Sequence, residues 1–71
     1  MSRTVAKAQR LNLLREELRL RPRTVVELAR RHETSRRTIE RDLATLAEQM
    51  GEELRKDTSH RWYIPNRTPG L

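Results

Sequence analysis

Apolar residues recur at helical spacing in the first part of this chain. Leu11, Leu14 and Leu18 fall at positions i, i+3 and i+7, which form one stripe of an α-helix. The surrounding segment contains neither Gly nor Pro, and Pro22 follows it, so the helix should stop near Leu20. The pattern therefore predicts a first helix at about residues 4–20.

A second, short helix is predicted at about residues 25–31. Thr24 and Glu27 have the spacing of a capping box, in which each side chain hydrogen-bonds the other residue's backbone N–H. The residues expected to face the core from this helix are Val25, Leu28 and Ala29.

A third helix is predicted at about residues 36–50, with Ser35 as its N-cap. Gly51 stands just past its end, where a glycine in a left-handed conformation commonly terminates a helix. Its apolar stripe consists of Ile39, Leu43, Leu46 and Met50.

After Gly51 the apolar pattern changes to a period of two. Residues 53–56 and 61–64 alternate around a turn-rich segment at 57–60, which predicts a hairpin over about 52–64 with Leu54, Trp62 and Ile64 facing inward. Residues 65–71 resemble a tail or linker. We thus expect one domain over residues 1–64, mainly α with a small β-hairpin, in the order α-α-α-β-β.

Composition narrows the function classes. The chain has 71 residues and no Cys, and 16 Lys and Arg against 10 Asp and Glu leave a net charge of +6, which favours a polyanionic partner. His32 and His60 are far apart, and the carboxylates lack the spacing of an acid/base pair, so we expect no metal, no cofactor and no enzyme activity. No apolar run approaches the roughly 20 residues of a membrane span, so we expect a soluble, cytoplasmic protein.

Two helices joined by a short turn, over residues 24–50, form a helix-turn-helix. Within it, residues 35–43 read SRRTIERDL, which resembles the S-x-x-T-I-x-R-D-L signature of DeoR-type winged helix-turn-helix domains. The doubled Arg and the preceding Glu27-Leu28-Ala29 are most similar to the N-terminal domain of bacterial WYL-domain regulators, and the resemblance covers about residues 7–64. It implies a bacterial transcriptional regulator whose third helix enters the DNA major groove and whose wing lies along the backbone or in the minor groove. The ligand-sensing WYL domain is not in this chain. Two alternatives stay open: the chain is a fragment of a larger regulator, or it is a stand-alone reader.

The predicted DNA contacts lie mainly on the third helix. Its first turns should reach base edges through Arg and the carboxylate of Glu40, although Glu40 would equally pair with Arg36 along the helix. Phosphate contacts are expected from the two helix starts, from the wing, and from the basic residues of the first helix, Arg3, Lys7, Arg10, Arg15 and Arg19. The DNA-binding set is Thr24, Ser35, Arg36, Arg37, Thr38, Glu40, Arg41, His60 and Arg61.

Three further expectations concern residues outside that set. Asp42, at the edge of the core stripe, should pair with Arg10 or Arg15 of the first helix, and Trp62 should pack in the core rather than stack on a base. Glu33 stands where the resembled family usually has Gly, and a positive φ there would cost about 1 kcal/mol.

The expected partner is double-stranded DNA, with no membrane and no small-molecule ligand for this segment. Leu13 and Leu20 lie off the core stripe and would form a patch for a homodimer. Two alternatives stay open: a winged-helix module that docks on another protein, and a non-specific nucleic-acid binder.

Overall fold

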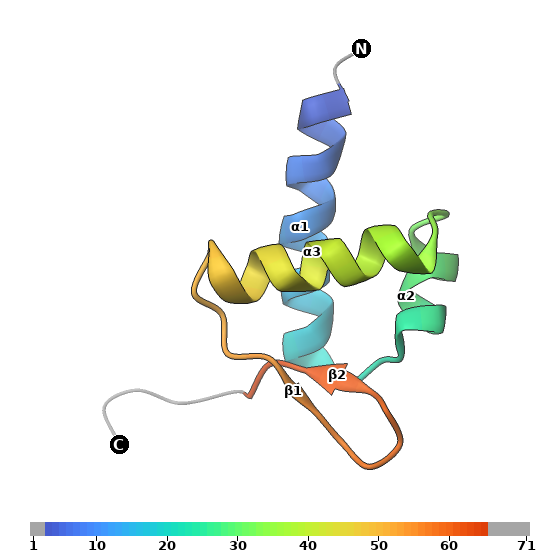
Figure 1. Ribbon diagram of the computed structural model, residues 1–71, viewed down its shortest axis with the longest axis vertical. Helices are drawn as coiled ribbons and strands as arrows, with labels where there is room; N and C mark the ends of the chain where they lie inside the picture. Colours follow the sequence, from blue (N-terminus) through green and yellow to red (C-terminus); the bar gives the residue numbers. More distant parts are fainter. Residues whose placement is uncertain (1–2, 66–71) are drawn as a thin grey trace.

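The computed structural model describes residues 3–65, with side chains from residue 7 onward, and contains three helices followed by a hairpin (Figure 1). The elements are α1 (Arg3–Leu20), α2 (Val25–Arg31), α3 (Arg36–Glu48), β1 (Arg55–Lys56) and β2 (Trp62–Tyr63). This order confirms the predicted α-α-α-β-β layout of a winged helix-turn-helix.

The core lies where α3 crosses α1, with α2 closing one side and the hairpin closing another (Figure 1). Burial of each large apolar side chain there stabilises the fold by roughly 1.5–3 kcal/mol. The residues that are buried there confirm the predicted apolar stripes of the helices, except at the end of α3. The buried apolar residues are Leu14, Leu18, Leu28, Ala29, Ile39, Leu43, Leu46 and Ile64.

The prediction that Met50 continues the buried stripe of α3 is wrong. The helix ends at Glu48, and Met50 is 37% exposed. Gly51 adopts φ +70°, and the N–H of Glu52 then donates to the carbonyl of Leu46 at 2.9 Å. Met50 thus lies after the last residue of α3, in the turn that leads to Gly51.

The turn between α2 and α3 is closed by two backbone hydrogen bonds. The N–H of Thr34 donates to the carbonyl of Ala29 at 2.9 Å, and the N–H of Glu33 donates to that of Arg30 at 3.3 Å. These are the two bonds of a Schellman motif, whose C′ position requires a left-handed residue. Glu33 occupies that position with φ 52°, so the positive φ considered from the sequence is present.

The hairpin pairs Arg55 with Tyr63 and Lys56 with Trp62 in antiparallel register. On its other edge, Trp62 forms a bridge with Arg23, in which the two N–H groups donate at 2.7 and 2.9 Å to the two carbonyls. The N–H of Ile64 donates to the carbonyl of Leu18 at 3.0 Å. The hairpin is consequently anchored to the end of α1 and to the linker that follows it.

Within residues 3–65, none of the helices is both long enough and apolar enough to cross a membrane. The predicted tail at 65–71 lies outside the described residues, apart from the half-buried Pro65.

Candidate nucleic-acid interface

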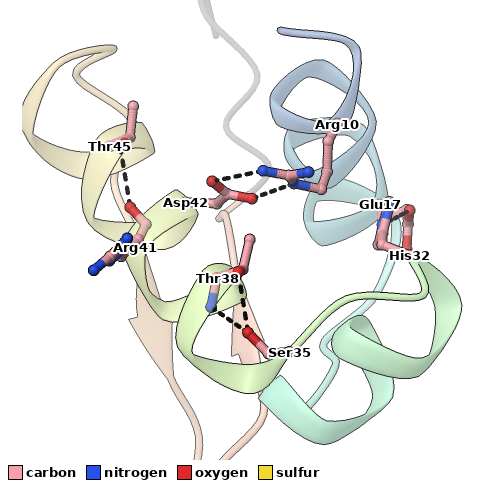
Figure 2. A network of polar contacts seen from close by, with 8 residues as sticks. All are labelled: Arg10, Glu17, His32, Ser35, Thr38, Arg41, Asp42 and Thr45. Atoms are coloured by element: carbon pink, nitrogen blue, oxygen red, sulfur yellow. Dashed lines mark hydrogen bonds and ion pairs between the residues drawn. The ribbon is translucent and has the colours of Figure 1, made fainter. Parts of the chain in front are cut away.

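The start of α3 is fixed by Ser35 (Figure 2). Its Oγ accepts the backbone N–H of Thr38 at 3.1 Å and its hydroxyl donates to Thr38 Oγ1 at 3.0 Å. This confirms the predicted N-cap, and Thr38 itself is half-buried. The Thr38 hydroxyl already has a partner, so its predicted base contact would have to compete with this bond.

The two faces of α3 differ sharply. Ile39, Leu43 and Leu46 face the core, whereas Arg37 and Arg41 are exposed on the opposite side. The exposed line continues with Ala44 and Glu48. The burial of one face thus turns the arginines of the other face outward.

The exposed arginines of α3 carry no partner among the residues that the structure describes. In the part of the chain that the structure describes, the guanidinium groups of Arg36, Arg37 and Arg41 form no ion pair and no hydrogen bond. The Arg36–Glu40 pair that the sequence left open is also not formed between these described side chains. Three guanidinium groups at the start of α3 are thereby free to bind an external acceptor.

The basic residues of α1 behave differently. Arg10 binds Asp42, and Arg15 and Arg19 both bind Glu52, at 3.5 and 3.2 Å. The phosphate contacts expected from these three arginines would have to compete with ion pairs to carboxylates that lie more than thirty positions away in the sequence. Lys7 is exposed, and the side chain of Arg3 lies outside the described residues.

A second set of polar contacts joins α1 to the end of α2 through Glu17, and its contact with His32 is drawn in Figure 2. Its carboxylate accepts from His32 Nε2 at 2.8 Å and from Arg31 Nε at 3.0 Å, and lies 4.0 Å from Arg23 Nε. Sequence reasoning did not identify this cluster, because Glu17 sits beside the apolar stripe without any motif. It ties α1 to the end of α2, where the turn that leads to α3 begins.

Thr24 caps α2 as predicted. Its Oγ1 accepts the N–H of Glu27 at 3.1 Å, and its own N–H donates to Glu27 Oε1 at 2.9 Å. This backbone N–H holds the pKa of Glu27 below its ordinary value. The hydroxyl of Thr24 is engaged in the cap, so its predicted DNA contact would have to compete with this hydrogen bond.

The tip of the wing is organised by Asp57. Its carboxylate accepts the N–H groups of Arg61 and Ser59, each at 2.9 Å, and the Nε of Arg61 at 3.0 Å. These bonds, that from the Arg61 N–H above all, lower the pKa of Asp57. His60 takes φ 62° at the bulge position of this turn. Two residues of the wing were predicted to contact DNA. His60 is exposed at the tip, and Arg61 is exposed but paired with Asp57.

Trp62 is half-buried and packs against the core cluster, in agreement with its predicted packing role. The ammonium of Lys56 lies 5.3 Å from the centre of its ring, a cation–π arrangement that the sequence did not indicate.

A groove of about 770 Å³ runs between α3 and the hairpin. Leu43, Val25, Leu54 and Trp62 supply its apolar floor, and Ala44 and Ala47 of α3 line one wall. Four of the predicted DNA-binding residues also border it, namely Thr24, Arg36, Glu40 and His60. Arg37 and Arg41 do not line it, so the structure divides the predicted site into an exposed helix face and a groove.

No three His, Asp or Glu side chains among the described residues are grouped so as to hold a metal ion. In comparisons with known proteins, no family model, curated protein or solved structure matches the chain.

Proposed function

We propose that this chain binds double-stranded DNA sequence-specifically, with α3 in the major groove, as the reader domain of a bacterial transcriptional regulator. The observation that carries the proposal is the exposed pair Arg37 and Arg41, one turn apart on α3 and without a partner in the described part of the chain. Arg binds the O6 and N7 atoms of guanine through two parallel hydrogen bonds, which is the commonest specific contact in the major groove.

The spacing of the two arginines suits adjacent steps of a duplex. Four residues of α-helix advance about 6 Å along its axis, a length comparable to the rise of two base pairs at about 3.4 Å each. Each guanidinium then reaches its own base pair. Arg36, at the first position of α3, contacts the flanking phosphate or base, and the wing tip at His60 contacts the backbone.

The ion pairs of α1 support a compact reading surface rather than a uniformly basic domain. Arg10, Arg15 and Arg19 are held by carboxylates of the same chain, whereas Arg36, Arg37 and Arg41 have no such partner among the described residues. The regulatory role and a cytoplasmic location at the nucleoid rest on the resemblance of residues 35–43 to DeoR-type domains.

The test is a selection of bound duplexes from a random pool, followed by affinity measurements over a salt series on the enriched sequence and on a scrambled control. We expect an enriched site that contains guanines and a clear preference over the control. Salt-dependent binding without enrichment would identify a non-specific nucleic-acid binder. Absence of binding at low salt would favour the protein-docking alternative.

A further inference from the structure

We infer that the groove between α3 and the hairpin is a binding site for a small apolar carboxylate. Its volume of about 770 Å³ falls within the roughly 300–1,000 Å³ of small-molecule sites. The sequence predicts no such ligand, because the lining residues come from three separate stretches of the chain, at 24–26, 36–47 and 54–62.

The floor of the groove selects for an apolar body. Val25, Leu54 and Trp62 pack against the core from one side and remain partly uncovered on the other. Val26, at the edge of the groove, is 46% exposed. Covering this surface removes apolar area from water, which favours binding in proportion to the area covered.

The rim of the groove selects for a single negative charge. Arg36 and Lys56 carry permanent positive charges, and Glu40 is the one carboxylate among the lining residues, which leaves one positive charge in excess. Among the described residues, neither Arg36 nor Lys56 has an acidic partner, and the ammonium of Lys56 lies over the ring of Trp62. Thr24, whose hydroxyl is engaged in the cap of α2, and Ser59 are also among the lining residues.

These features together favour an amphipathic monoanion over a DNA strand at this location. A phosphodiester strand is charged at every nucleotide and has no large apolar body to cover Leu54 and Val25. An arylalkyl carboxylate has a single negative charge and an apolar body. A bound carboxylate would engage Arg36 and approach His60, which the proposed DNA surface also uses. The ligand would therefore compete with DNA for these residues. This competition rests on the proposed function, but ligand binding itself does not.

The binding test uses the full chain without DNA, with phenylbutyrate as the probe. Trp62 is the single Trp of the chain and lines the groove, so its fluorescence reports occupancy directly. We expect a saturable change with phenylbutyrate. Neutral phenylbutanamide, which lacks the charge, and butyrate, which lacks the ring, should each bind at least about fivefold more weakly, the ratio that corresponds to about 1 kcal/mol.

Two matched pairs of variants locate the site. Ala47→Glu places a carboxylate in the groove and should abolish saturation, whereas Ala8→Glu makes the same change at an exposed position of α1 outside the groove. Arg36→Gln should weaken binding about fivefold, and Arg30→Gln, an exposed arginine of α2 that does not line the groove, should leave it unchanged. All four positions are exposed, and circular dichroism verifies that each variant is folded.

The inference is overturned if phenylbutyrate gives no saturable change, if phenylbutanamide binds equally well, or if Ala47→Glu and Ala8→Glu behave alike. Because DNA is absent from these experiments, their failure would leave the proposed DNA binding untouched. Conversely, an unenriched duplex pool would leave this ligand site standing.

Discussion

Arg10 of α1 and Asp42 of α3 are joined by two hydrogen bonds across 32 positions of sequence (Figure 2). Nε of Arg10 lies 2.5 Å from Oδ2 of Asp42, and Nη2 lies 3.4 Å from Oδ1. The Asp42 side chain is 2% exposed, and Asp42 is the one charged residue that is buried within the described chain. The pair ties α3 to the helix behind it and thereby helps to set the direction of the exposed arginines.

Asp42→Asn should lower the free energy of unfolding by about 2 kcal/mol, because the buried amide accepts a weaker hydrogen bond and leaves Arg10 without its counter-charge. Urea denaturation followed by circular dichroism measures the change. Glu48→Gln, which neutralises an exposed carboxylate of the same helix, is the matched control and should have little effect. An unchanged stability with an altered base preference would show that Asp42 contacts DNA instead.

Arg37→Ala and Arg41→Ala should each reduce the preference for the selected duplex by about 1–3 kcal/mol, because each removes a two-bond contact to a base edge. Competition binding against scrambled DNA measures this preference. Arg61→Ala provides the contrast. The loss of a phosphate contact should weaken binding to both duplexes equally and lower the salt slope by about 1. If the α3 variants show that same uniform loss, their arginines contact phosphates and the proposed reading of bases is wrong.

Glu33→Gly should stabilise the domain by about 1 kcal/mol, since glycine adopts φ 52° without the steric cost that a side chain carries. In a domain of this size the melting temperature would rise by about 4–8 °C. Glu33→Ala, which removes the carboxylate but keeps Cβ, serves as the control and should give no such gain. Equal gains from both substitutions would assign the effect to charge.

The wing should lose stability in acid through Asp57. The N–H groups of Arg61 and Ser59 hold the folded-state pKa of Asp57 below its ordinary value of 3.8. The stabilisation is therefore complete above about pH 4 and is lost as the pH falls through the lowered folded-state pKa. Chemical shifts of the Arg61 amide, followed between neutral and acidic pH, should change with a midpoint below 3.8. Asp57→Asn should remove this transition, and a midpoint at or above 3.8 in the unsubstituted protein would contradict the assigned hydrogen bonds.

His60→Gly should separate the conformation of the wing from its contacts. Glycine relieves φ 62° at the turn and should stabilise the domain by roughly 1 kcal/mol, while loss of the imidazole should weaken binding to selected and scrambled duplexes alike. Thermal denaturation and the two affinities are measured on the same preparation. Unchanged affinities would mean that the wing tip does not contact DNA, and a loss confined to the selected duplex would mean that it reads bases.

Local patterns determined the elements of this protein. Capping by Thr24 and Ser35, the glycine at 51 and the apolar stripes each depend on residues within a few positions of one another, so the order and approximate bounds of the helices follow from the sequence. The same patterns turned Arg37 and Arg41 outward. The end of α3 was the exception, because Met50 continues the period of the stripe although the helix has already stopped.

Tertiary structure decided which distant groups meet. The sequence required a partner for Asp42 but offered both Arg10 and Arg15, and the crossing of α1 and α3 brings Arg10 to Asp42 and Arg15 to Glu52. The bridge between Arg23 and Trp62 and the groove beside α3 likewise have no local signature. Such contacts depend on the angles at which helices cross and on the reach of each side chain, and both are set only when the whole core packs.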